Sequence, residues 1–152
     1  QNKDAILVLI GKGEYEETIR NKVKSLNLDK HVKFLGIRDD VNEIMQAMDI
    51  FIMPSLYEGL PVVGIEAQAS GIHCIMSENI TKETKVLKET EFISLEKSAK
   101  EWANIILKSH ESYIRKDRFQ DLLKSHFDIK MEAKKLEQFY FTKINEVKWE
   151  DV

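Results

Sequence analysis

The chain has 152 residues, 43% hydrophobic and 32% charged, which is the balance of a soluble globular protein with one ordinary domain. Its net charge of -3 comes from 23 basic and 26 acidic residues mixed along the sequence, so no basic patch for nucleic acid is expected. The single cysteine, Cys74, excludes an internal disulfide and fits a reducing, cytoplasmic compartment. The four histidines show no metal-ligand spacing with it, so no metal site is expected.

The ends of the sequence bear on what kind of chain this is. No apolar run approaches the length of a membrane span, and residues 1–4 lack the basic-then-apolar layout of a signal peptide. There is no initiating methionine, and the first apolar run begins almost at once. We therefore expect a fragment of a longer protein.

Strands and helices are predicted to alternate over the first part of the chain. Residues 5–10 (AILVLI) form an apolar run ended by glycine, which predicts a strand covered on both faces of a parallel sheet. The remaining periodicities predict strands at 32–35, 50–53, 72–76 and, more weakly, 91–95, with helices at 14–26, 41–48 and 61–69. Asp39 or Asp40 is expected to cap the helix at 41–48. Such alternation with short connections predicts an open, doubly wound α/β sheet.

The pattern changes beyond Ser98, where three consecutive amphipathic helices are predicted. They span 98–110, about 113–126 and about 130–147. Their apolar stripes are expected to be core and not ligand contacts, and consist of Trp102, Ile105, Ile106, Phe119, Leu122, Leu123, Leu136, Phe139, Tyr140 and Ile144. The expected organisation is an α/β core over 1–97, truncated at its N-terminal side, and helices over 98–152 that pack on the same domain. A bare apolar face on residues 130–150 would otherwise mediate self-association.

Three turns follow predicted strands, where open parallel sheets bind ligands. The first, Gly11-Lys12-Gly13, has Glu16 where a dinucleotide fingerprint needs its third glycine, and no phosphate-loop motif is present. Gly11 and Gly13 still permit close approach of a ligand to the backbone, although a plain turn is the simpler interpretation. The second turn is Gly36-Ile37-Arg38, and the third spans 55–60.

The third turn carries the strongest signal, in the stretch "PSLYEGLPVVGIEAQASG". Pro61 is suited to the first helical position, so a helix N-terminus is predicted there, with N–H groups that attract phosphate or sugar oxygens. Gly59 lets a ligand come close. Glu58 lies just outside the helix, and Glu66 lies in its second turn on a segment that reads as buried on most faces. An unpaired buried carboxylate is costly, so a function is expected for it.

The two glutamates suit a sugar nucleotide, because carboxylates accept hydrogen bonds from vicinal hydroxyls while N–H groups hold the diphosphate. The simpler interpretation of either residue alone is that Glu66 pairs with a nearby Lys or Arg and that Glu58 is merely solvated. Their joint position at one turn favours the binding site.

At these residues the chain resembles the retaining glycosyltransferases of family four, also called glycosyl transferases group 1, which have the two-domain GT-B fold. The motif "EGLPVVGIE" has the family's two glutamates with seven residues between them. The stretches "LVLIGKGEYEETI", "VKFLGIRDDVNEIMQAMDIFIMPSLYEGLP" and "EAQASGIHCIMSENITKE" are similar to its donor-binding half, in the same order. The resemblance is closest over residues 5–95. Within the family, the chain most resembles the enzymes of bacterial capsular and exopolysaccharide synthesis.

The resemblance implies a Rossmann-like open parallel sheet with helices on both faces, and a site for a UDP- or GDP-sugar without a bound metal. By position, Glu66 would accept hydrogen bonds from the ribose, and Glu58 from hydroxyls of the donor sugar. Gly59 and Leu60 would offer backbone N–H groups to the donor. The turn Gly36-Ile37-Arg38 would lie against the nucleobase.

The implied reaction is transfer of a sugar from a nucleoside diphosphate sugar to a polysaccharide or lipid-linked acceptor, with retention at the anomeric carbon. The family's phosphate-binding Arg and Lys are expected before residue 5, and the acceptor would bind through a missing N-terminal domain, so the fragment alone is expected to be inactive. The full-length protein is expected in the cytoplasm or at the inner face of the membrane. His73 stands where relatives often have proline, and is expected to be structural.

Three alternatives stay open. One is a non-catalytic nucleotide-sugar binding module, which would share every residue named above. Another is an epimerase-like or hydrolytic enzyme with the GT-B architecture. A receiver-like regulatory domain is disfavoured, because Ile10-Gly11-Lys12 ends the first strand where such a domain needs acidic residues. The donor base and sugar, the acceptor, the linkage and the oligomeric state are not specified by the sequence.

Overall fold

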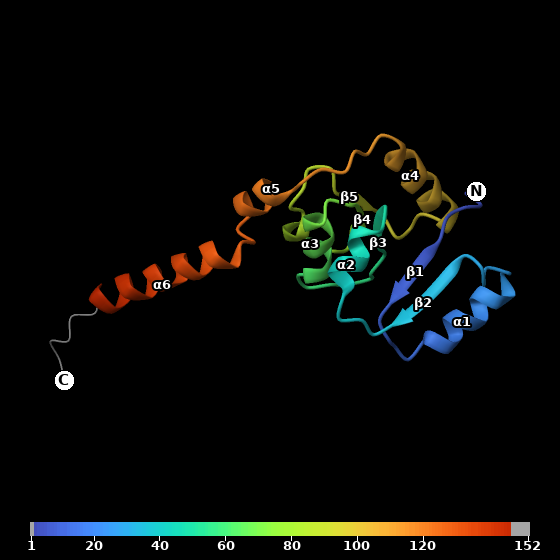
Figure 1. Ribbon diagram of the computed structural model, residues 1–152, viewed down its shortest axis with the longest axis horizontal. Coiled ribbons are helices and arrows are strands. Elements are labelled where there is room, and N and C mark those ends of the chain that lie inside the picture. The colour runs from blue at the N-terminus through green and yellow to red at the C-terminus, as the bar shows by residue number, and fades with distance from the viewer. Residues whose placement is uncertain (1, 147–152) are drawn as a thin grey trace. The chain divides into compact units, whose positions relative to one another are not determined.

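The computed structural model describes residues 2–146 and divides after Met48 into two compact units. The first unit contains β1 (Leu7–Ile10), α1 (Glu16–Ser25), β2 (Val32–Gly36) and α2 (Val41–Gln46) (Figure 1). The second contains β3 (Ile50–Met53), α3 (Val62–Ala69), β4 (His73–Ser77), a 3-10 turn at Lys82–Thr84, β5 (Glu91–Ile93), α4 (Ala99–Glu111), α5 (Phe119–Lys124) and α6 (Ile129–Glu146). The predicted alternation of strands and helices is confirmed, with ends that differ by a few residues.

The first unit is a parallel pair of strands with little buried surface. β1 pairs with β2 in a register that begins at Leu7 opposite Val32 and shifts after Leu9. None of the four β1 residues is buried, and Leu7 keeps 48% of its surface exposed. The prediction that residues 5–10 are covered on both faces is therefore wrong. The strand has one hydrogen-bonded neighbour, and α1, which connects the two strands, buries none of its residues.

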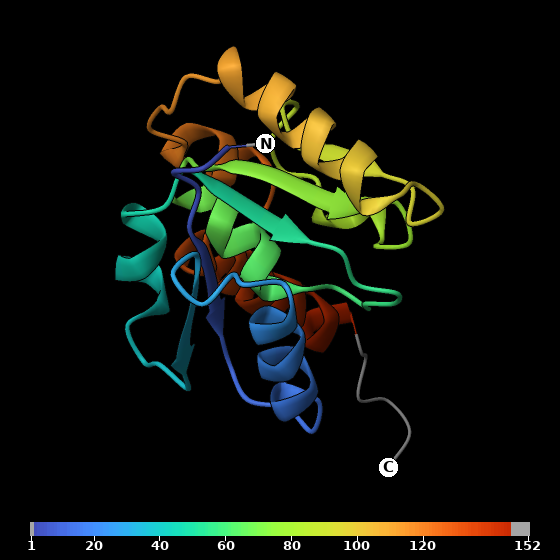
Figure 2. The same ribbon diagram turned by 90° about the vertical axis from the view of Figure 1, so that its right-hand side faces the viewer.

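The second unit contains a three-stranded parallel sheet with β4 in the centre. β4 pairs with β3 from His73 opposite Ile50 onwards, and with β5 up to Ser77 opposite Ile93. The arrows of β3 and β4 point the same way (Figure 2). All five residues of β4 are buried, because a central strand is covered on both edges and both faces.

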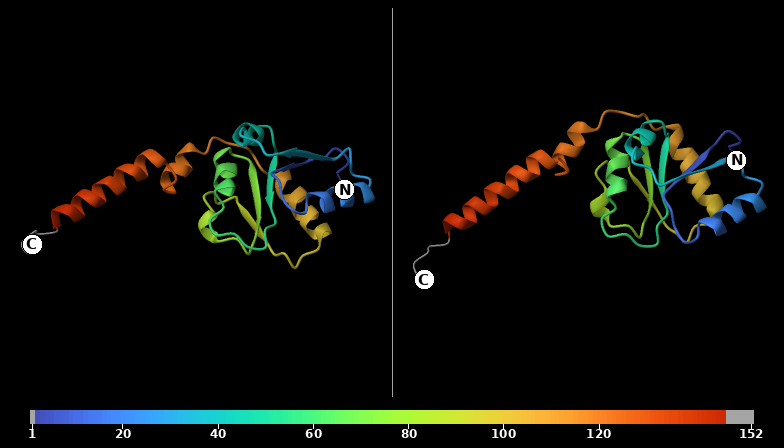
Figure 3. Two further views of the ribbon diagram at one scale, coloured as in Figure 1. Left: turned by 90° about the horizontal axis from the view of Figure 1, so that it is seen from below. Right: turned by 60° about the horizontal axis from the view of Figure 1, so that its bottom comes forward.

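Helices cover both faces of this sheet. Successive strand residues point to opposite faces, so Ile75 and Met76 report on the two sides. Ile75 belongs to a buried cluster with Ile93 and with Trp102 of α4, whereas Met76 lies against α3 at Gly64. Figure 3 shows α3 and α4 on either side of the strands. The expected layering is therefore present in this unit.

The five strands form two hydrogen-bonded sheets, one in each unit, where the sequence predicted one. The fold class itself is confirmed, since parallel strands alternate with helices and the chain ends in a long helix. The predicted boundary between residues 97 and 98 stays a prediction. Among residues 2–146, no helix is long and apolar enough to cross a membrane.

The three C-terminal helices differ in how closely their bounds and burial agree with the prediction. α4 begins at a complete capping box, in which the Ser98 hydroxyl accepts from the Glu101 N–H and the Glu101 carboxylate accepts from the Ser98 N–H. Its Trp102 is buried as predicted. The stripe of α6 is not core in this structure, because Leu136, Phe139, Tyr140 and Ile144 each expose more than half of their surface. Residue 147, the predicted end of this helix, lies outside the described residues.

The second of these helices begins at Phe119 and not near residue 113, because the connection between α4 and α5 (residues 112–118) has other partners. The Tyr113 hydroxyl donates to the Gly71 carbonyl oxygen at 2.9 Å. The Arg115 guanidinium donates twice to the Ser70 carbonyl oxygen, at 3.1 and 2.7 Å. The α4–α5 connection is thus fastened to the turn between α3 and β4. Phe119, predicted to be core, is 55% exposed.

Candidate functional site

The two glutamates of the motif lie on either side of the start of α3. Glu58 is half-buried in the loop between β3 and α3, and Glu66 is exposed in the second turn of the helix. Pro61 precedes the first helical residue, with φ of -72° and ψ of 101°, so the predicted helix start is confirmed to within one residue. The first N–H groups of a helix have no partner within it, and here they belong to residues that follow Pro61.

Glu66 is more exposed than the apolar sequence around it predicted. Four residues of α3 are buried, namely Gly64, Ile65, Ala67 and Gln68, while Val62 is 61% exposed. Residues two apart in a helix are separated by about 200° around its axis, so Glu66 faces away from both Gly64 and Gln68. The expected buried carboxylate was therefore wrong, because α3 keeps one open face along its length.

Both carboxylates are available to a ligand. Among residues 2–146, neither the Glu58 nor the Glu66 side chain takes part in an ion pair or a hydrogen bond. The alternative in which Glu66 pairs with a nearby Lys or Arg is not seen in this part of the chain. Two acidic groups that accept no internal hydrogen bond retain their full capacity to accept from hydroxyl groups.

The loop that carries Glu58 is fixed by a hydrogen bond from the segment that follows the neighbouring strand, β4. The Asn79 side-chain amide, two residues beyond the end of β4, donates to the Leu56 carbonyl oxygen at 3.2 Å. Both segments leave the carboxyl ends of parallel strands, the edge at which open α/β sheets bind ligands. Gly59 and Leu60 follow on the same loop and are exposed. The predicted donor contacts of this loop are thus accessible.

In the first unit, the structure brings two predicted turns together. The Gly11 N–H donates to the Gly36 carbonyl oxygen at 2.7 Å, so the turn after β1 lies beside the turn after β2. Both glycines have positive φ, +124° and +67°, a backbone conformation that other residues rarely adopt. Gly13 has open space around its Cα. Gly11 and Gly36 therefore have a conformational reason to be glycine, whether or not a ligand binds there.

Arg38 is engaged by an acidic neighbour. Its guanidinium donates to both carboxylate oxygens of Asp40, with 2.7 Å from Nε to Oδ1. This hydrogen bond lowers the pKa of Asp40 and raises the pKa of Arg38. Asp40 stands at the N-cap of α2 but makes no side-chain cap there, because its carboxylate is taken by Arg38. Asp40 therefore occupies the predicted N-cap position, but the expected side-chain cap hydrogen bond is absent.

An open hollow of about 430 Å³ lies at this turn. Two of its lining residues, Ile37 and Arg38, are predicted nucleobase contacts, and the others are Asp39, Asp40, Asn42 and Glu43. Gly11, Gly13 and the 36–38 turn belong to the first unit, while Glu58, Gly59, Leu60 and Glu66 belong to the second.

Two further groups bear on the chemistry of the second unit. His73 is buried, with Nε2 3.1 Å from a Glu91 carboxylate oxygen and its ring stacked on Tyr113 at 4.6 Å between centroids. These are contacts of a structural residue. Burial lowers the pKa of His73 and raises that of the Cys74 thiol to about 12, so Cys74 is unreactive. In the described part of the chain, no three His, Cys, Asp or Glu side chains gather as metal ligands would.

Sequence reasoning missed Gln68. Between residues 61 and 69 only Glu66 and Gln68 are polar, and a function was expected only for the glutamate. In the structure the Gln68 side chain is fully buried and makes five hydrogen bonds. The available signal was an amide on the apolar face of a short helix, one turn after Gly64.

The chain is similar in sequence to proteins named as glycosyltransferases. It is 42% identical over 104 residues to EpsF of Bacillus subtilis (strain 168), covering 68% of this chain and 27% of the relative. It is 40% identical over 75 residues to the UDP-Gal:alpha-D-GlcNAc-diphosphoundecaprenol alpha-1,3-galactosyltransferase of Escherichia coli, covering 49% of this chain and 19% of the relative. The chain thus spans about a quarter or less of the length of these relatives.

The structure is similar to that of Anabaena HepE in complex with UDP, with a TM-score of 0.77 and 19% identity over 93% of this chain and 42% of HepE. The same protein in complex with UDP-glucose matches with a TM-score of 0.74. This likeness shows the fold, one half of a GT-B structure. The sequence profile of the family named Glycosyl transferases group 1 matches residues 1–122. The chain belongs to the glycosyl transferases group 1 family.

Proposed function

We propose that this chain is the donor-binding half of a retaining glycosyltransferase, which transfers a sugar from a UDP- or GDP-sugar to a polysaccharide or lipid-linked acceptor. One observation carries the proposal: the two glutamates of "EGLPVVGIE" flank the start of α3, and neither is used inside the described chain. Membership of the group 1 family supports the reaction class. The UDP-glucose complex of HepE supports a nucleotide sugar as donor.

In this proposal each residue orients the donor. Glu66 accepts hydrogen bonds from ribose hydroxyls, and Glu58 accepts from hydroxyls of the transferred sugar. The N–H groups of Gly59 and Leu60 face the donor. In the first unit, the absence of side chains at Gly11 and Gly13 permits close approach of a ligand to the backbone.

The nucleobase lies against Gly36, Ile37 and Arg38. Arg38 is then oriented by the Asp40 carboxylate, which holds its guanidinium by two hydrogen bonds.

The chemistry follows from where charge develops. As the bond between the anomeric carbon and the diphosphate breaks, negative charge grows on the leaving phosphate, and prearranged N–H donors stabilise that state more than the bound substrate. Two carboxylates that grip hydroxyls at the two ends of the donor fix its orientation and so lower the entropy cost of reaction. No protein nucleophile is assigned, and no metal is required.

The test is a calorimetric titration with UDP, GDP, ADP and UDP-glucose, made on this chain and on the full-length transferase. A uridine or guanosine diphosphate is expected to bind. Glu66→Ala is expected to weaken it by at least about tenfold, since one lost hydrogen bond to a charged group costs roughly 1.5–3 kcal/mol. The matched control is Glu137→Ala, an exposed glutamate on α6, which is expected to leave the affinity unchanged.

Two outcomes would contradict the proposal. One is that the full-length protein binds no nucleoside diphosphate. The other is that Glu66→Ala and Glu137→Ala bind alike. A nucleotide-sugar binding module without catalysis would instead bind the donor normally and release no free UDP or GDP when candidate acceptors are added.

A further inference from the structure

The Gln68 side chain uses its entire hydrogen-bonding capacity inside the protein. Its Nε2 donates to the carbonyl oxygens of Gly64, at 2.9 Å, and Thr84, at 2.7 Å. Its Oε1 accepts from the N–H groups of Val86 and Leu87, both at 2.9 Å, and from the Thr90 hydroxyl at 2.7 Å. Two carbonyls face one end of the amide and three donors face the other, so only one orientation of the amide satisfies all five partners.

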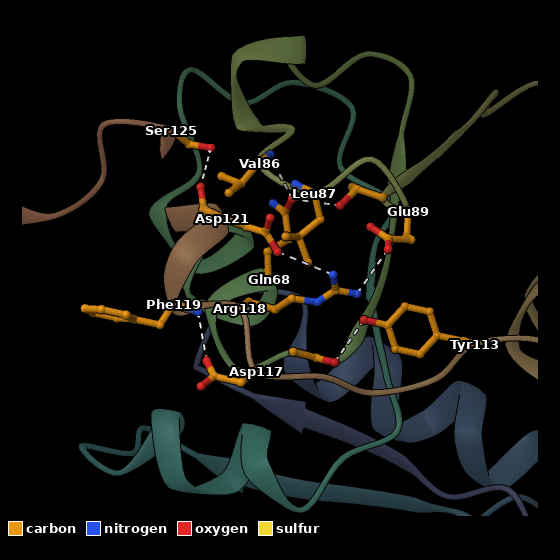
Figure 4. Close-up of polar contacts among 12 residues, drawn as sticks. Gln68, Val86, Leu87, Glu89, Tyr113, Asp117, Arg118, Phe119, Asp121 and Ser125 are labelled. Carbon is orange, nitrogen blue, oxygen red and sulfur yellow. Dashed lines mark hydrogen bonds and ion pairs between the residues drawn. The ribbon is translucent and has the colours of Figure 1, made fainter. Parts of the chain in front are cut away.

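Four of these five partners lie on the connection between β4 and β5. That connection is irregular beyond the 3-10 turn, yet Thr84, Leu87 and Thr90 are buried. Buried backbone N–H and C=O groups need partners, and here the partner is one side chain of α3 (Figure 4). Gln68 therefore supplies the partners that secondary structure would otherwise give to the Thr84 carbonyl and to the Val86 and Leu87 N–H groups.

The same contacts fix α3. Gly64, one turn before Gln68, packs so closely that an added Cβ would lie 2.8 Å from Met76 Cε and 3.1 Å from Thr84 Cγ2. α3 has only eight residues, and its inner face is thus held at both turns. Glu66 lies between these two positions and faces the other way. Any rotation or tilt of the helix on this support moves the Glu66 carboxylate.

We infer that Gln68 is a positioning residue for Glu66: by locking α3 to residues 84–90, it holds the Glu66 carboxylate where the donor ribose binds. The inference rests on the proposed function and extends it to a residue that touches no ligand. Rigid support of Glu66 matters, because a misplacement of about 1 Å in a site can lower the reaction rate by up to roughly 100-fold. A merely structural Gln68 would contribute stability alone, and the two roles predict different measurements.

The test is a double-mutant cycle for the Kd of UDP-glucose in the full-length protein, or of whichever nucleotide sugar the wild type binds. Gln68→Met keeps the size of the side chain and removes all five hydrogen bonds. It is expected to weaken binding roughly tenfold in the wild-type background. In the Glu66→Ala background, the same change is expected to weaken binding less than about twofold, because residues that act as a unit are not additive.

Thr90→Val is the milder companion, for the case in which Gln68→Met does not fold. It removes one of the three hydrogen bonds to Oε1 at constant shape, and is expected to weaken binding by roughly two- to threefold, again only when Glu66 is present. Amide hydrogen exchange at Val86 and Leu87 is expected to accelerate in Gln68→Met, which reports the loss of the support independently of any ligand.

The outcomes separate the two proposals. If the wild type binds a nucleotide sugar and Gln68→Met weakens binding equally with and without Glu66, or not at all, the positioning role is overturned and the donor site stands. If the wild type binds no nucleotide sugar, the proposed function fails and the positioning role fails with it. Unchanged exchange at Val86 and Leu87 in Gln68→Met overturns the positioning role directly.

Discussion

β1 and β4 show how little the apolarity of a strand says about its burial. β1 reads LVLI and β4 reads HCIMS, so β1 is the more apolar of the two. Yet β4 is buried at every residue and β1 at none. β4 has a hydrogen-bonded strand on each edge and helices on both faces, while β1 has one neighbouring strand. Apolar runs therefore predict strands, whereas burial depends on what surrounds the strand.

The difference in burial between the two strands is tested by shortening one apolar side chain in each sheet. Ile75→Ala, in a fully buried position of β4, is expected to lower the free energy of unfolding by about 2–5 kcal/mol. Leu7→Ala, in a position 48% exposed on β1, is expected to lower it by less than about 1 kcal/mol. Urea unfolding followed by circular dichroism measures both. Equal losses would mean that β1 is as well covered as β4.

A smaller effect is expected from the glycines that connect elements in the two units. Gly71 has φ of +73°, and an added Cβ would collide with the Lys116 carbonyl oxygen of the α4–α5 connection. Gly71→Ala is therefore expected to cost about 1–3 kcal/mol in the free energy of unfolding. Gly13→Ala, where a Cβ meets nothing within 4 Å, is the control and is expected to change it by less than about 0.5 kcal/mol. A neutral Gly71→Ala would contradict the observed fastening of this connection.

The smallest effect expected is a pH dependence that originates at the first residue of β4. Burial lowers the pKa of His73 in the folded protein, although its hydrogen bond to Glu91 opposes that shift. The unfolded chain, with an ordinary pKa of about 6.5, then binds more protons than the folded chain just below that pH. Stability from His73 is thus present above about pH 6.5 and is lost as the pH falls through the interval down to its folded-state pKa.

His73→Gln is expected to flatten this loss, measured as urea midpoints between about pH 5 and 8. His126→Gln is the control, because His126 is exposed on the surface. A midpoint for His73→Gln that falls with acid as steeply as the wild type would contradict the assignment.

Much of the fold was predictable because its signals are local. The span 50–53 was predicted as β3 without error, and β4 and the start of α3 within one residue, since glycine, proline and apolar runs mark these boundaries. The misses arise where distant groups compete for the backbone. Residues 113–118 were predicted to form the start of a helix. Instead, Tyr113 and Arg115 donate hydrogen bonds to the turn at Ser70 and Gly71, and the helix begins only at Phe119.

The positions of the two glutamates were predictable for the same reason, while their role in binding a donor stays a prediction. The spacing of Glu58 and Glu66 is written in nine consecutive residues, and the structure places both beside the start of α3. The exposure of Glu66 was not foreseen, because an apolar segment does not say which of its faces the rest of the chain leaves open. The pairing of Arg38 with Asp40 and the role of Gln68 depend on side-chain geometry that no periodicity encodes.

The fastening of residues 113 and 115 to the turn between α3 and β4 couples two parts of the chain mechanically. The three hydrogen bonds end on Ser70 and Gly71, directly after the helix that carries Glu66. Any pull transmitted along the backbone from α6 through α5 first meets Arg118, which is buried and paired with Glu89, and then this anchor, before it reaches α4 and the sheet. These hydrogen bonds must then either break or move the end of α3. A force applied at α6 would therefore displace the short helix α3.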